Sequence, residues 1–83
     1  MSNTATASTT NAYNAVLTWC RRQTQENAHF RPCMRTAQDG ACLVVDVNRS
    51  ELSAIGLVTG CKVLARGASW LDCAAALGIA VAA

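Results

Sequence analysis

Long apolar runs, a secretory leader and closely paired cysteines are all missing from this sequence. No apolar run approaches the roughly 18–20 residues of a membrane span. The first residues, MSNTATASTTN, lack the basic and apolar regions of a secretory signal. The five cysteines are odd in number and contain no CxxC pair, which argues against a disulfide framework. We therefore predict a cytoplasmic protein, in a bacterial or host cytosol, with free thiols and no membrane contact.

Metal-ligand spacings and catalytic groupings are also absent. The one plausible zinc set (Cys20, His29, Cys33 and Cys42) has spacings of 9, 4 and 9, which match no common finger or ribbon. His29 and Cys33 stand too far apart along a predicted strand to form a nucleophilic pair. The few acidic residues do not cluster in the sequence. We predict a protein that is not an enzyme and that holds no cofactor and no metal.

Charge and aromatic side chains are both sparse. The net charge is only +2, but six of the seven basic residues are arginine, which favours bidentate contacts to carboxylates or phosphates. The hydrophobic fraction of 52% is too high for an intrinsically disordered chain. At 83 residues the chain is predicted to form one domain, with a polar leader over 1–9, a compact α/β domain over 10–79 and an apolar tail over 80–83.

Two amphipathic helices are predicted at the ends of that domain. The first runs from Thr9 or Thr10 to Glu26, with an apolar stripe at i, i+3, i+4 and i+7 (Tyr13, Val16, Leu17 and Cys20). The second begins at a capping box, Ser69–Asp72, and ends at Gly78 in a Schellman-type stop. Its stripe consists of Trp70, Cys73, Ala74 and Leu77.

Three strands are predicted between the helices. An edge strand over 29–36 contains Pro32, which cannot donate to a strand ladder. After the turn Gln38–Gly40 comes the densest β-branched run, Ala41–Val47, which we place in the centre of the sheet. A short helix from Arg49 to Leu57, capped by Asn48, then leads to a third strand, Cys61–Arg66, that is either parallel or antiparallel to the second. The predicted fold class is α/β (α+β), a small three-stranded sheet in the order α-β-β-α-β-α with helices packed on one face.

Alternation along the strands divides the predicted sheet into two faces. The helix-covered face consists of Phe30, Met34, Leu43, Val45, Val47, Val63 and Ala65. The opposite face consists of Arg31, Cys33, Arg35, Cys42, Val44, Asp46, Lys62, Leu64 and Arg66. It is either an ordinary solvated surface or a binding surface with charge at the rim and aliphatic side chains in the centre. We predict partner contacts at Arg31, Arg35, Val44, Lys62, Leu64 and Arg66.

Trp19 lies off the apolar stripe of the first helix. It is either a lid over the sheet edge or an exposed anchor, and exposed tryptophan is common at binding hot spots. With Arg21 and Arg22 it forms a second candidate patch for a partner.

Two short segments resemble parts of known families. The segment Leu71–Ala83, LDCAAALGIAVAA, resembles the second helix and turn of a helix-turn-helix unit, which implies DNA binding through a recognition helix. A Schellman stop explains the same residues. The segment Leu52–Val63, LSAIGLVTGCKV, resembles part of the ferrous-iron-transport accessory domains of SH3-like fold, and we interpret it as local turn chemistry.

The predicted function is protein binding. A small, alanine-rich chain with an open sheet face and no catalytic set is similar in type to many phage-encoded inhibitors, including anti-CRISPR proteins, which block large effector complexes by surface binding. We therefore predict an anti-CRISPR-like inhibitor from a phage or mobile element, with a host protein complex as partner. The alternative is a small nucleic-acid-binding regulator. A homodimer is possible in either case.

Overall fold

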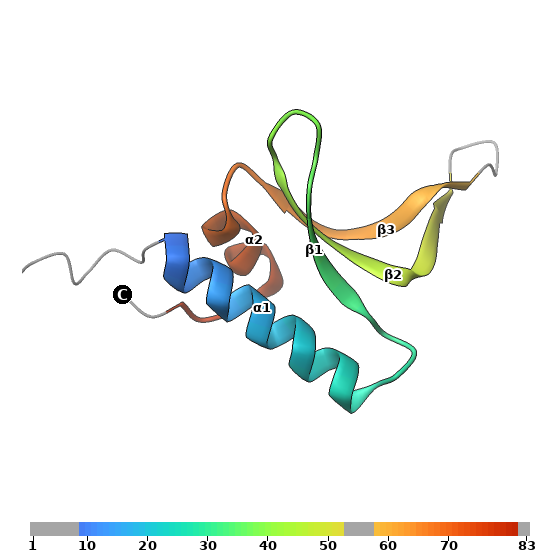
Figure 1. The fold of residues 1–83 in the computed structure, drawn as a ribbon, viewed down its shortest axis with the longest axis horizontal. Coiled ribbons are helices and arrows are strands. Elements are labelled where there is room, and N and C mark those ends of the chain that lie inside the picture. Colours follow the sequence, from blue (N-terminus) through green and yellow to red (C-terminus); the bar gives the residue numbers. More distant parts are fainter. Residues whose placement is uncertain (1–8, 53–57, 82–83) are drawn as a thin grey trace, which may run out of the picture.

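A computed structural model describes residues 9–52 and 58–81 of the chain and contains two helices and one sheet (Figure 1). The elements follow in the order α1 (Thr9–Glu26), β1 (Pro32–Thr36), β2 (Cys42–Leu52), β3 (Val58–Gly67) and α2 (Trp70–Leu77). The helices gather at one side of the sheet, and the far ends of β2 and β3 extend away from them. The predicted class, a small mixed α and β domain with a three-stranded sheet, is confirmed.

Helix α1 has the predicted bounds but turns a different face to the core. The buried positions are Ala12, Val16 and Cys20, which repeat every four residues. Tyr13, predicted to be buried, is 42% exposed and meets the Trp70 ring edge-on, with ring centroids 5.8 Å apart. Alanine at position 12 lets the backbones of α1 and α2 approach closely, so the bulky tyrosine packs at the margin of the helix pair.

Helix α2 begins and ends as predicted. The Ser69 hydroxyl accepts a hydrogen bond from the Asp72 backbone N–H at 3.3 Å, and the Asp72 carboxylate accepts one from the Ala68 N–H at 3.1 Å. At the C-terminus Gly78 has φ = 72°, and the Ile79 N–H donates to the Ala74 carbonyl at 2.9 Å. This is the Schellman arrangement, in which glycine adopts the left-handed conformation without a Cβ penalty. Ile79 and Val81 then pack against the core.

The sheet has the order β1-β2-β3, and both pairs of strands are antiparallel. The central place predicted for Ala41–Val47 is confirmed. The short helix predicted from Arg49 is wrong as far as Leu52, because β2 continues through these residues and pairs Ser50 with Cys61. The rest of that predicted helix, including Ile55, lies outside the described residues. Pairing of the strand backbones therefore replaces the capping box predicted at Asn48.

The two faces of β2 are the reverse of the prediction. The turn after β1 is closed by hydrogen bonds from the Ala37 N–H to the Ala41 carbonyl and from the Gly40 N–H to the Ala37 carbonyl, both 2.9 Å. Three residues therefore separate the paired positions, and this register sets Met34 opposite Val44. Since directly paired residues share a face, Val44 faces the helices and Val45 faces away from them.

The hydrophobic core follows from this register. Its buried members are Val16, Cys20, Val44, Ala65, Cys73 and Ala74, and Met34, Cys42 and Leu64 pack against them. The placement predicted for Met34 and Ala65 is correct, whereas Leu43, Val45, Val47 and Val63 lie on the opposite face. The prediction was wrong by one residue in the facing of β2, and such a shift moves every side chain of a strand to the opposite face of the sheet.

The reversed facing predicts that a carboxylate introduced at Val44 lowers the stability of the domain much more than one introduced at Val63. Val44→Asp places an unpaired carboxylate in the core, which costs several kcal/mol, and is expected to unfold this small domain. Val63→Asp on the other face is expected to change the free energy of unfolding by about 1 kcal/mol or less. Circular dichroism during urea titration measures both variants. A folded Val44→Asp together with an unfolded Val63→Asp would restore the original assignment of the faces.

Candidate functional site

The face of the sheet that points away from α1 and α2 is the candidate binding surface. Its centre is a stripe on β2, Leu43, Val45 and Val47. Cys33 and Val63 flank Val45 from the neighbouring strands, which leaves Val45 only 6% exposed, while Val63 is 42% exposed. Within the described part of the chain both helices pack on the other side of the sheet. On this side Val63 is exposed, Leu43 and Val47 are half-buried, and Val45 is buried.

Arginines border the stripe. The register puts Arg35 and Arg66 on either side of Leu43. The Arg31 carbonyl accepts from the Val47 N–H at 3.1 Å, which places Arg31 beside Val47. These three arginine side chains are exposed. We refer to Arg31, Cys33, Arg35, Leu43, Val45, Val47, Val63 and Arg66 as the open sheet face.

An acidic side chain balances part of this charge. Asp39 Oδ2 lies 2.6 Å from Arg66 Nη2. The Ala41 backbone N–H, which donates to Asp39 Oδ1 at 3.0 Å, and the nearby Arg66 together hold the pKa of Asp39 below its usual value. The positive charge of the open sheet face is therefore concentrated at Arg35 on β1 and at Arg31, directly before β1.

The structure separates the six residues predicted for this surface into two groups. Arg31, Arg35 and Arg66 lie on the open sheet face. Val44 is fully buried, Leu64 packs against the core, and Lys62 stands opposite Asp46 on the side of the helices. Sequence reasoning missed the apolar centre of the surface, Leu43, Val45, Val47 and Val63. The separation of Ala37 and Ala41 by a three-residue turn was the signal that could have identified it.

Asp46, predicted to lie on the functional half of the strand, is instead a buried structural residue. Its side chain is fully buried, and Oδ1 accepts hydrogen bonds from the backbone N–H groups of Arg31 at 3.2 Å and Asn48 at 3.0 Å. Oδ2 makes no hydrogen bond within the described part of the chain but lies 3.4 Å from Arg49 Nε. The carboxylate thereby joins the start of β1 to the irregular middle of β2.

Removal of this carboxylate is expected to destabilise the domain. Asp46→Ala leaves two backbone N–H groups without their acceptor, at about 1–3 kcal/mol for each group that stays buried, so we expect the free energy of unfolding to fall by about 2–4 kcal/mol. Asp46→Asn keeps an oxygen acceptor and is expected to lose less. Urea unfolding of the two variants gives the comparison, and equal losses would contradict the role assigned to Oδ1.

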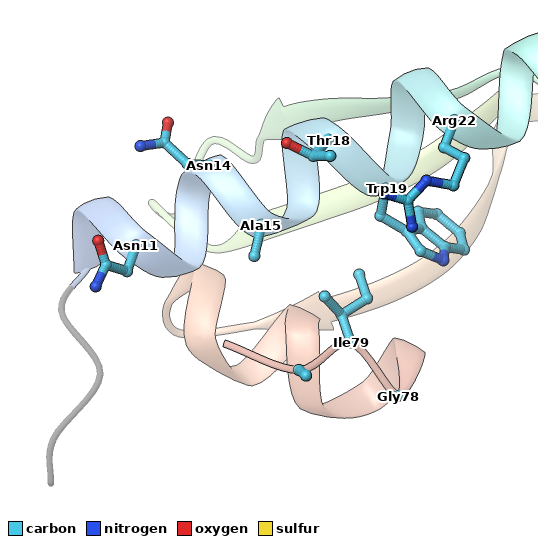
Figure 2. Close-up of a pocket in the computed structure, with 9 residues that line it drawn as sticks. Asn11, Asn14, Ala15, Thr18, Trp19, Arg22, Gly78 and Ile79 are labelled. Carbon is cyan, nitrogen blue, oxygen red and sulfur yellow. The ribbon is translucent and has the colours of Figure 1, made fainter. Parts of the chain in front are cut away.

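The second candidate patch divides between two grooves. Trp19 and Arg22 line an open groove of about 590 Å³, where α1 faces the chain that follows α2 (Figure 2). Trp19 is half-buried against the core, and its ring meets the Phe30 ring edge-on, with ring centroids 6.1 Å apart. Ile79, from the chain after α2, points toward α1 (Figure 2). Trp19 is therefore not a fully exposed side chain, and its contact with a partner stays a prediction. Arg21 lines a different groove, between α1 and β1.

The five cysteines are all free thiols. Burial raises the pKa of Cys20 to about 11, and the neighbouring Cys33 adds to this shift. Burial also raises the pKa of Cys73, whose thiol donates to the Cys42 carbonyl at 3.4 Å. Across residues 9–52 and 58–81, no three His, Cys, Asp or Glu side chains come together as a metal site.

These environments predict an order of thiol reactivity. The thiolate is the reactive form, and a raised pKa lowers its population. We expect iodoacetamide at pH 8 to modify the exposed Cys61 first, and to modify Cys20 and Cys73 only at the rate of unfolding. Peptide mass spectrometry over a time course measures the order. Early modification of Cys20 in the folded protein would contradict its placement in the core.

Comparison of the chain with protein-family models, with curated proteins and with solved structures gives no match. Neither of the described helices is long and apolar enough to cross a membrane. The function of this protein is therefore inferred from the surfaces described above.

Proposed function

We propose that this protein is a small protein-binding module and that its open sheet face is the binding surface. The observation that supports this proposal is an apolar stripe on the side of the sheet opposite both described helices, with arginines at its rim. Apolar centres with polar rims are the usual organisation of protein–protein interfaces. Arginine is also enriched among residues that contribute strongly to binding.

The charge of this surface favours a partner with acidic side chains around an apolar centre. Arg35 lies on β1 and Arg31 lies directly before this strand, and both arginines border the apolar stripe. A guanidinium can bind a carboxylate bidentately. Complementary charge at a rim increases the rate of association and selects the partner.

A protein partner is favoured over nucleic acid by the position of the aromatic side chains. Proteins that bind single-stranded nucleic acids commonly stack bases on aromatic rings. Here Tyr13 meets Trp70, and Trp19 meets Phe30, in edge-on pairs on the helix side of the sheet. The open sheet face has no aromatic residue among its eight members.

Within this proposal, inhibition of a host complex is the first biological role to test. The chain is small, and its proposed action is to block a surface of its partner, as anti-CRISPR proteins block effector complexes. Expression of the chain in cells that carry an active CRISPR system, followed by measurement of the plating efficiency of a targeted phage, tests this role directly. A plating efficiency as low as in CRISPR-active cells without the chain would contradict the anti-CRISPR hypothesis.

Charge reversal on the open sheet face tests the binding surface. The triple variant Arg31→Glu, Arg35→Glu and Val63→Asp is expected to weaken partner binding about 100-fold, equivalent to about 2.7 kcal/mol. Lys62→Glu is the matched control, because Lys62 lies on the helix side and is exposed there, and its binding should stay within about twofold of the parent chain.

The measurement begins with co-purification from cytosol of the source or its host. Mass spectrometry identifies the retained protein, and titration calorimetry with the purified partner then compares the variants. Unchanged affinity of a folded triple variant would rule out the open sheet face. A gel shift with RNA or DNA whose affinity falls steeply with salt would instead support the nucleic-acid alternative.

A further inference from the structure

A second surface lies at the outer edge of β1, which among residues 9–52 and 58–81 pairs with a strand, β2, on one side only. The Arg31 carbonyl bonds to the Val47 N–H and the Ala37 N–H bonds to the Ala41 carbonyl, so the odd-numbered residues between them direct their backbone groups toward β2. In an antiparallel ladder the alternate residues direct theirs outward. The N–H groups of Met34 and Thr36 and the carbonyls of Pro32 and Met34 therefore point to the open edge.

A groove of about 460 Å³ lies beside this edge. Helix α1 and the start of β1 line it together, through Tyr13, Leu17, Cys20, Arg21, Thr24, Gln25, Arg31, Pro32, Cys33 and Met34. One wall is thus a helix and the other is an edge strand. Peptide-binding domains that add a strand to a sheet obtain affinity from backbone hydrogen bonds and specificity from side-chain pockets along the groove.

The charge of the groove indicates what it binds. Arg21 on α1 and Arg31, directly before β1, line the groove, and its lining residues include no Asp or Glu. Two guanidinium groups suit a segment with carboxylates. A second copy of this chain suits it less well, because antiparallel pairing of two β1 edges brings Arg31 and Arg35 of both copies onto one short sheet face.

We propose that the groove between α1 and β1 binds an extended acidic peptide of a partner protein, which adds to β1 as a fourth strand. The peptide backbone bonds to the outward N–H groups of Met34 and Thr36, since the Met34 carbonyl already accepts a hydrogen bond from Arg35 Nη1 at 3.3 Å. Successive side chains of an added strand point to opposite faces of the sheet. The row that faces α1 presents a carboxylate to Arg21 and apolar side chains to Leu17 and Tyr13, and the other row presents a carboxylate to Arg31. The groove shares Arg31 and Cys33 with the open sheet face, but the strand edge and the wall formed by α1 lie outside that face.

The probe is a short fluorescein-labelled peptide that repeats Glu-Glu-Val-Val, so that both faces of the added strand carry glutamate and valine. It is blocked at both ends and titrated with the full chain in a fluorescence anisotropy assay. A peptide with lysine in place of glutamate is expected to bind at least about tenfold more weakly. The glutamate peptide N-methylated at alternate residues is expected to lose a similar factor, because it cannot donate to the strand edge.

Two pairs of matched variants locate the binding site. Arg21→Glu is expected to weaken peptide binding about tenfold, whereas Arg66→Glu, on the far strand of the open sheet face, should leave it within about twofold. Thr36→Pro removes one outward N–H without a loss from the β1–β2 ladder and should weaken binding, whereas Thr36→Ala, at the same exposed position, should not. Circular dichroism establishes that each variant is folded.

Nitrogen–proton correlation spectra of the chain add a direct observation. Titration with the glutamate peptide is expected to shift the amide signals of Met34 and Thr36 more than those of Val63 and Arg66. No anisotropy change, equal binding of the N-methylated peptide, or an effect of Arg66→Glu equal to that of Arg21→Glu would each overturn the proposal. Light scattering that shows a dimer, with the same β1 amides shifted by protein concentration alone, would assign the edge to a second copy and would also overturn it.

Discussion

The buried carboxylate of Asp46 is the interaction on which the arrangement of this sheet depends. It accepts hydrogen bonds from two backbone N–H groups, that of Arg31 directly before β1 and that of Asn48 on β2. Beyond Asp46 the pairing of β2 with β3 shifts, since the next paired residue of β2 is Ser50. A buried backbone N–H needs a partner, and at this irregularity the carboxylate provides one. It thereby holds the start of β1 against the middle of β2, in the register that the turn between Ala37 and Ala41 sets.

That register produces both candidate surfaces. With Val44 and Met34 turned to the helices, the second row of aliphatic residues on β2 must face outward, where it forms the centre of the open sheet face. The same register directs the backbone groups of Thr36 and Met34 to the edge beside α1. Arg31 lines the α1–β1 groove and also borders the open sheet face. Two partners, or two parts of one partner, can therefore meet at β1.

The core consists of small side chains, and neither of the two described helices covers the second face of the sheet. Its buried side chains are mainly alanine, cysteine and valine, which let helices and sheet approach closely but bury little area for each residue. Burial contributes roughly 25 cal/mol for each Å² of apolar surface, so covering the open face with a partner adds stability that the chain itself does not supply. Any ligand that binds only the folded state stabilises it in this way.

The sequence by itself determined the features that depend on contacts a few residues apart. These are the bounds of α1, both caps of α2, the turn at Gln38–Gly40 and the central strand that begins near Ala41. Tertiary structure decided the facing of β2, its extension to Leu52 and the burial of Asp46. The run Leu43–Val47 has aliphatic residues on both faces, and its one charged residue, Asp46, shares a face with Val44. Alternation therefore indicated the wrong face, because Asp46 is buried on the side that the helices cover. The capping pattern at Asn48 favours a helix locally, but strand pairing with β3 gives the backbone groups of this segment their hydrogen-bond partners instead. Contacts between residues far apart in the chain thus decided which side chains form the candidate surface.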